Sequence, residues 1–238
     1  MSAAGTRTAF SRPEPDAPAR SRAFDAAGWE LLSERLAFLG NSLLDPPRQE
    51  ASPGLHEPFW DAFATGLVEI GCANERLVEG VERARRFARC RAVSDDDAVE
   101  RVRVEHARLF VGPPKPAAPP WETCYLLPGR IGEVGFGAPT FDMRRILREA
   151  GLAVRGPSNQ YADHMGLELL YAATVCARFA HASPTAAEAA EFARFVGEHP
   201  ASWASGFRAA VEEAAPDGYY RCIAETVEGL CRCLALAA

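Results

Sequence analysis

The sequence contains no apolar run long enough to span a bilayer, and its first 23 residues lack the apolar core of a signal peptide. It also lacks a glycine-rich dinucleotide loop, a phosphate-binding P-loop and an H-E-x-x-H zinc motif. These absences argue against the enzyme classes that such short motifs reveal. They predict a cytoplasmic protein with no stable membrane insertion.

Basic residues are too few for a general nucleic-acid-binding protein. The 238 residues include 26 Lys and Arg against 32 Asp and Glu, which gives a formal net charge of −6. Nucleic-acid binding requires a basic face that displaces counterions from phosphates. A mildly acidic chain suits a cationic partner, although the same charge also simply keeps a protein soluble.

The cysteines follow no recognisable spacing. There are seven, which is an odd number, and no C-x-x-C pair occurs. Cys231 and Cys233 are the nearest neighbours, but no second pair or nearby histidine completes a zinc site. The pattern therefore predicts neither a disulfide framework nor a metal centre, and we expect reduced thiols.

Apolar residues recur at steps of three and four along most of the chain, which predicts helices and an all-α fold. We expect a bilobed helical globule of about eight helices, with one domain over residues 24–238 after a disordered arm over residues 1–23. The helices are expected near residues 24–43, 58–79, 94–110, 140–150, 159–181, 183–197, 200–214 and 218–236.

A long central segment interrupts the helical pattern. Residues 112–139 contain seven prolines, so neither a helix nor a strand is expected there. The same segment carries Trp121, Tyr125 and Phe136. A loop with this much aromatic content is usually packed or functional, and it is the candidate seam between two helical halves.

Polar residues at the start of an apolar segment form the main candidate site. His164 and Glu168 are four residues apart and would share one face of a helix. The helix that follows is apolar nearly all round, which predicts burial, and buried ionisable groups need partners. Asp163, His164 and Glu168 therefore either form internal pairs that lock this helix to the proline-rich loop or line an opening.

Two catalytic alternatives have less support in the sequence. A metal-dependent helical enzyme using His164 and Glu168 would need further ligands, which the spacing does not identify. A nucleophilic pair of cysteine and histidine would need a local signature, and none occurs.

Four short motifs occur in order along the chain. They are E-x-x-R-L-F-V-G-P at residues 105–113, P-P-W-E-T-x-Y at 119–125, D-H-x-G-L-E-L at 163–169, and H-x-x-x-W at His199 and Trp203. In these motifs the chain resembles the TorD/DmsD family of redox-enzyme maturation chaperones. Two departures are Thr123, where the family usually has serine, and Ala162, where it often has proline.

The resemblance implies an all-helical cytoplasmic chaperone and not an enzyme. Such a protein binds the twin-arginine signal peptide of a molybdenum-containing oxidoreductase subunit. It holds back export until the cofactor is inserted and the subunit is folded, and it needs no cofactor or metal of its own. The residues that match the family's peptide-binding region are Trp121, Glu122, Tyr125, Asp163, His164 and Glu168.

These residue types suit a twin-arginine peptide. Guanidinium groups pair well with carboxylates, so Glu122, Asp163 and Glu168 are expected to meet the arginines at an accessible cleft. Trp121, Tyr125, Phe136 and Met165 are expected to line the wall that receives the apolar part of the peptide. An assembly factor that grips the folded redox subunit itself remains an alternative.

Overall fold

The fold is all-α, as the sequence predicts. A computed structural model describes residues 24–49, 52–91, 95–126, 134–153 and 160–236. Within these ranges the regular structure is helical, apart from isolated β-bridge residues: Trp121 and His164 bridge each other, and Arg48 is a bridge residue as well. The arm predicted over residues 1–23 lies outside the described residues.

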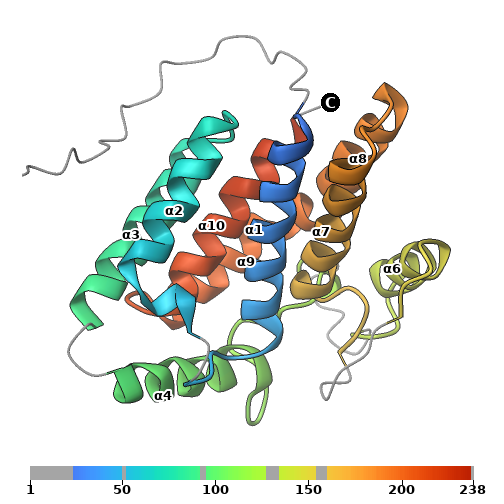
Figure 1. The fold of residues 1–238 in the computed structure, drawn as a ribbon. Coiled ribbons are helices and arrows are strands. Elements are labelled where there is room, and N and C mark those ends of the chain that lie inside the picture. The colour runs from blue at the N-terminus through green and yellow to red at the C-terminus, as the bar shows by residue number, and fades with distance from the viewer. Residues whose placement is uncertain (1–23, 50–51, 92–94, 127–133, 154–159, 237–238) are drawn as a thin grey trace, which may run out of the picture.

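Helices from opposite sides of the proline-rich loop pack against each other (Figure 1). Helix α1 (Ala26–Leu44) lies along α7 (Met165–His181), and α3 (Glu75–Arg91) lies along α10 (Tyr219–Ala235). The buried apolar side chains of both halves belong to one core cluster. The loop therefore does not separate two independent cores.

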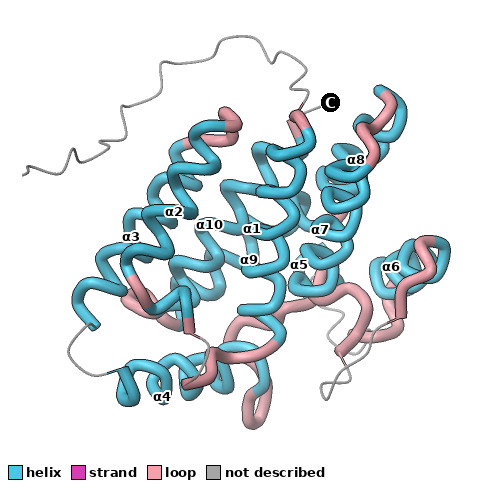
Figure 2. The backbone as a smooth tube through the Cα atoms, viewed as in Figure 1, coloured by secondary structure: helices cyan, strands magenta, loops and turns pink. Residues whose placement is uncertain are grey.

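The other helices surround these two pairs, and Figure 2 shows how the loops join them. Helix α6 stands apart from the main bundle and has its closest helix packing against α5 (Figure 1). The remaining elements are η1 (Pro53–Leu55), α2 (Glu57–Glu69), α4 (Asp95–His106), the π-helical turn η2 (Ala107–Val111), α5 (Thr123–Leu126), α6 (Ala138–Glu149), α8 (Ala186–Glu198) and α9 (Pro200–Ala214).

Two glycines permit the close approach of α1 and α7. A Cβ atom on Gly40 would lie 2.8 Å from the carbonyl oxygen of Gly166, and a Cβ on Gly166 would lie 2.7 Å from that of Gly40. Real Cβ atoms do not come this close to backbone oxygens, so any side chain would push the helices apart. This crossing fixes the start of α7, where the candidate site lies.

Three helix boundaries differ from the prediction. The helix expected over residues 58–79 is divided by a turn at Gly71, whose φ of 70° favours glycine. Helix α7 begins at Met165, several residues later than expected. Helix α8 begins at Ala186, later than the expected start near residue 183, because Thr185 caps it in a capping box with Glu188.

The expectation that all thiols are reduced is wrong for one pair. Cys72, just after α2, and Cys233, on α10, form a disulfide with Cα atoms 5.9 Å apart. The two residues are separated by 161 positions, so their spacing gave no signal. The other five cysteines are free.

The helices of the described ranges do not include one that is both long enough and apolar enough to cross a membrane.

Candidate functional site

The proline-rich loop is pinned to the start of α7 by backbone hydrogen bonds. The amide of Met165 donates to the carbonyl of Pro120 (2.9 Å), and the amide of Glu122 donates to the carbonyl of Asp163 (2.9 Å). These bonds flank the β-bridge between Trp121 and His164. The predicted proximity of the loop motif and the D-H motif is therefore confirmed.

Asp163 is fully buried and its carboxylate is already satisfied. It accepts hydrogen bonds from the Thr123 amide (3.1 Å), the Thr123 hydroxyl (2.6 Å) and the Thr140 hydroxyl (2.8 Å). Three donors offset much of the cost of burying a carboxylate. Thr123 stands where the family usually has serine, and its hydroxyl bonds Asp163 here. Through these bonds Asp163 connects the starts of α5 and α6 to the start of α7.

His164 is the N-cap residue of α7, not a residue within the helix. Its Nδ1 accepts a hydrogen bond from the Gly166 amide at 3.0 Å. Burial, together with the nearby His106, lowers the pKa of His164 to about 3. The imidazole is therefore neutral near pH 7. Its backbone is extended at the cap, so it precedes the first helical residue, although its carbonyl accepts a hydrogen bond from the Glu168 amide at 3.1 Å.

Glu168 and Glu122 form a buried pair of carboxyl groups. Glu168 Oε2 accepts a hydrogen bond from Trp203 Nε1 at 3.1 Å, whereas Oε1 receives none from an amide, hydroxyl or basic group of the described residues. The Glu122 carboxyl is within hydrogen-bonding reach of the Glu168 carboxyl, so the two can bond each other when one of them is protonated. Glu122 is bonded to His199 Nδ1 at 3.1 Å. Burial and then the charge of Glu122 raise the pKa of Glu168, which favours its protonated form.

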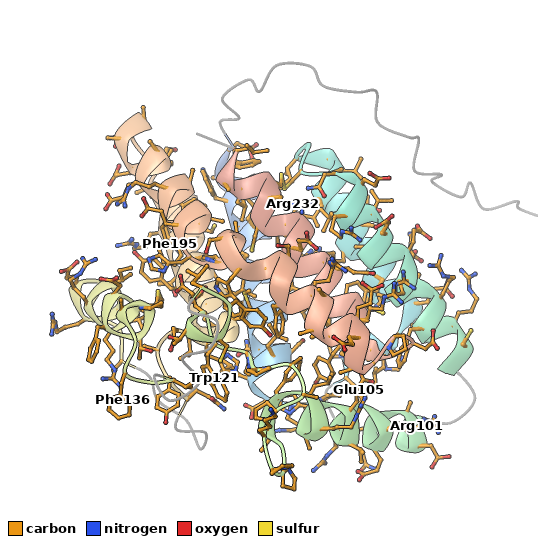
Figure 3. All side chains as sticks on the ribbon, turned by 180° about the vertical axis from the view of Figure 1, so that it is seen from behind. Arg101, Glu105, Trp121, Phe136, Phe195 and Arg232 are labelled. Carbon is orange, nitrogen blue, oxygen red and sulfur yellow. A yellow bond between two sulfur atoms is a disulfide. The ribbon has the colours of Figure 1, made fainter. Side chains whose placement is uncertain are left out.

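The expectation of an accessible acidic cleft is wrong for this structure. The exposed fractions of Glu122, Asp163, His164 and Glu168 are all 2% or less. Two of the expected wall residues also differ from the prediction: Met165 is buried in the core, and Phe136 is 70% exposed at the periphery (Figure 3). The polar residues come together because they form internal bonds, which was one of the two outcomes that the sequence left open.

The aromatic side chains of the loop motif are partly exposed. Tyr125 stacks on Trp203, with ring centroids 5.2 Å apart. Trp121 meets Tyr161 edge-on at 6.0 Å, and its indole N–H has no partner among the described residues. Trp203 therefore contacts both Tyr125 and Glu168. In the sequence, the H-x-x-x-W motif was the one signal that pointed to Trp203.

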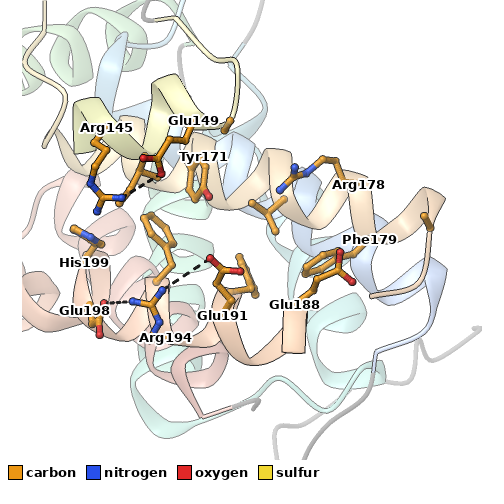
Figure 4. A pocket seen from close by; sticks show the side chains of 16 residues that line it. Arg145, Glu149, Tyr171, Arg178, Phe179, Glu188, Glu191, Arg194, Glu198 and His199 are labelled. Carbon is orange, nitrogen blue, oxygen red and sulfur yellow. Dashed lines mark hydrogen bonds and ion pairs between the residues drawn. The ribbon is translucent and has the colours of Figure 1, made fainter. Parts of the chain in front are cut away.

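A surface groove begins beside this buried cluster. It encloses about 490 Å³ between α6, α7 and α8, and His199 lines one end of it (Figure 4). Tyr171, Val175, Phe192 and Phe195 supply its apolar floor. The rim carries Glu149, Glu188, Glu191 and Glu198 together with Arg145, Arg178 and Arg194.

The rim charges are partly paired with each other. Arg194 bonds Glu198 at 2.7 Å and lies 4.0 Å from Glu191, and Arg145 bonds Glu149 at 3.2 Å. Glu191 is 75% exposed and has the longest of these contacts. It is therefore the rim carboxylate most available to an incoming cation.

Neither catalytic alternative gains support from this geometry. His164 uses Nδ1 for its own helix cap, and it is not in the group of possible metal ligands that includes Glu168. Cys124, next to the cluster, is partly buried, and burial followed by the charge of Asp163 raises the pKa of its thiol to about 11. A thiol of this kind is not an activated nucleophile.

A family model described as nitrate reductase delta subunit matches residues 74–209, which is more than half of the chain. The chain belongs to this family. The matched span contains the loop motif, the D-H motif and the H-x-x-x-W motif. It therefore covers every residue of the buried cluster.

Two curated relatives have names that agree with the motif resemblance. A probable Tat proofreading chaperone DmsD of Haemophilus influenzae is 26% identical over 120 residues, covering 50% of this chain and 53% of the relative. A chaperone protein TorD of Shewanella pealeana is 26% identical over 136 residues, covering 56% and 58%. The predicted membership of the TorD/DmsD-type chaperone family is confirmed, although the matches span only somewhat over half of each relative.

Proposed function

We propose that this chain is a cytoplasmic chaperone, not an enzyme, that binds the twin-arginine leader of a molybdenum-containing oxidoreductase subunit. Binding delays export until the cofactor is inserted and the subunit has folded. The names of the two relatives support this role, since one is a Tat proofreading chaperone and both are chaperones. The structural observation that carries the proposal is the groove between α6, α7 and α8.

The groove offers both kinds of contact that such a leader needs. Its apolar floor suits the hydrophobic part of the peptide, and the exposed Glu191 suits a guanidinium group. A space of about 490 Å³ holds a few side chains and not a whole peptide. The leader therefore lies across the groove and inserts only some residues.

The six residues predicted from the motifs take two roles in this proposal. Trp121 and Tyr125 are partly exposed and contact the peptide directly. Glu122, Asp163, His164 and Glu168 are buried, so they position the groove helices and do not pair with the arginines. The link is Glu122, whose partner His199 lines the groove.

Calorimetric titration with a synthetic twin-arginine leader tests the proposal. We expect Glu191→Gln and Tyr171→Ala each to weaken binding by roughly tenfold, because each removes one contact of the kind that carries recognition. The matched control is Glu213→Gln, an exposed glutamate on α9 outside the groove, which should bind as wild type does.

A leader with two lysines in place of the two arginines sharpens the test. Lysine keeps the charge but lacks the planar fork of guanidinium, so it should bind less tightly than the arginine leader. Equal binding of both leaders by wild type, or unchanged binding by both groove variants, would contradict the assigned contacts. Failure of the wild type to bind any leader would leave the assembly factor that grips the folded subunit as the better reading.

A further inference from the structure

Three side chains with metal-ligand chemistry lie together in the buried cluster beside the groove, and one of them, His199, also lines the groove. One ligand atom from each of Glu122, Glu168 and His199 lies within 4.8 Å of the others. They come from three separate places: the residue before α5, the first turn of α7, and the junction of α8 and α9. The tertiary fold, and not local sequence, therefore assembles this group.

The two carboxyl groups lack the basic partner that buried acids normally have. Within the described residues, no lysine or arginine forms an ion pair with Glu122 or Glu168. His199 bonds Glu122 but makes no such bond to Glu168. Trp203 uses only Oε2 of Glu168, which leaves the buried Oε1 without a basic or amide donor and with the Glu122 carboxyl as a neighbour that can bond it only by sharing a proton. Two buried carboxyl groups that face each other must either share a proton or face a cation, so a positive ion in place of the proton would satisfy both groups.

We propose that Glu122, Glu168 and His199 bind one divalent transition-metal ion of the Zn²⁺ class. One imidazole nitrogen and two carboxylate oxygens form a ligand set that Zn²⁺ accepts, whereas Mg²⁺ and Ca²⁺ prefer oxygen ligands alone. The charge of a dication offsets the charges of the two carboxylates. Binding releases any proton that the carboxyl pair holds.

Neighbouring groups are excluded as further ligands by bonds they already make. Asp163 accepts three hydrogen bonds, and His164 uses Nδ1 within its own cap. Three protein ligands leave a fourth position of a tetrahedral ion to water, on the side where His199 meets the groove. The ion would tie α5, α7 and the α8–α9 junction together. This inference does not rest on the proposed recognition of a leader peptide.

Titration of the full chain with Co²⁺ after dialysis against EDTA tests the site. Bound Co²⁺ should give weak visible bands typical of oxygen and nitrogen ligands, at one equivalent. It should give no thiolate charge-transfer band, which separates this site from the free cysteines. Zn²⁺ should displace Co²⁺, and it should raise the thermal midpoint of the wild type in proportion to its binding.

Two ligand variants and one control complete the experiment. Glu168→Gln and His199→Gln should each weaken Co²⁺ binding by more than the roughly 10- to 100-fold that loss of an outer-sphere partner costs. The control is His181→Gln, an exposed histidine at the end of α7, which should bind as wild type does. If Glu168→Gln fails to fold, the partly exposed His199 still carries the test.

Three results would overturn the proposal. These are a wild type that takes up no stoichiometric Co²⁺ or Zn²⁺, a spectrum dominated by thiolate ligation, or folded ligand variants that retain wild-type affinity. An unchanged thermal midpoint of the wild type in the presence of excess Zn²⁺ would agree with the first of these.

Discussion

Two regions of the molecule bury glutamates equally well but compensate them in opposite ways. On α10, Glu225 and Glu228 are 1% and 2% exposed, and arginines surround both. Arg83 bonds Glu225 at 2.8 Å, and Arg208 bonds Glu228 at 2.7 Å. In the buried cluster beside the groove, Glu122 and Glu168 are just as buried, and within the described residues neither is paired with an arginine or lysine.

The difference separates acidic residues that only stabilise the fold from acidic residues that could still bind a cation. The guanidinium groups on the α10 side neutralise Glu225 and Glu228, so these carboxylates are not available to a further cation. On the groove side two carboxyl groups face each other beside a neutral His164, and the pKa of Glu168 is raised. Burial alone therefore does not distinguish the two roles, whereas the identity of the partner does.

The largest expected effect is on the α10 side. Glu225→Gln removes the carboxylate that pairs with Arg83 and leaves Arg221 paired with Glu212 alone, and breaking such a buried pair should lower the free energy of unfolding by about 2–3 kcal/mol. Urea denaturation near pH 7 measures this loss. The exposed Glu213→Gln serves as control and should change stability by less than about 0.5 kcal/mol. Similar stability of the two variants would show that the arginines contribute little.

The second effect concerns acid stability of the groove side. Because the folded-state pKa of His164 is about 3 and its ordinary value is 6.5, the unfolded chain takes up a proton first as pH falls. Stability is therefore lost as the pH falls from about 6.5 towards 3.

His164→Asn should remove this contribution while keeping an acceptor for the Gly166 amide. Between about pH 7 and about pH 4.5, the wild type should lose roughly 2–3 kcal/mol more than the variant in urea unfolding. If the stability of wild type and variant falls in parallel with pH, the pKa of His164 is the same in the folded and the unfolded chain. That result would contradict the lowered pKa expected from its burial.

The smallest effect is expected where the carboxylate has no basic partner. With chelator present, Glu168→Gln should change the free energy of unfolding by less than about 1 kcal/mol, because glutamine preserves an acceptor for Trp203 and carries no charge. The free energies of unfolding of Glu168→Gln and Glu225→Gln should be measured side by side, and a much smaller loss for Glu168→Gln would support the comparison. A loss at Glu168 as large as that at Glu225 would mean that its charge is compensated in the fold.

The sequence predicted the elements of this fold better than the use of its polar residues. Apolar spacing located α1, α9 and α10 to within a few residues, because each buries a regular stripe against one core. The split between α2 and α3 was missed because Gly71 and the cap at Asn74 are weak local signals inside an apolar pattern.

The site shows where such reasoning stops. The motifs predicted that Trp121, Glu122 and Asp163 lie close together. The structure confirms this through the bridge of Trp121 and the hydrogen bond between the Glu122 amide and the Asp163 carbonyl. Spacing could not reveal that Thr123 and Thr140 satisfy Asp163, or that His199 reaches Glu122 across 77 positions. These bonds depend on how helices pack, which short-range periodicity does not encode.

Hydrogen–deuterium exchange of the full chain, with and without a twin-arginine leader, tests most directly whether the groove side is the recognition surface. We expect slower amide exchange in α6 and α8 when the leader is bound, with α3 unchanged, and a weaker effect from the twin-lysine leader. Equal protection by both leaders would contradict the assigned contact between guanidinium and carboxylate. Protection confined to α3 and α10 would contradict the assignment of the groove as the leader-binding site.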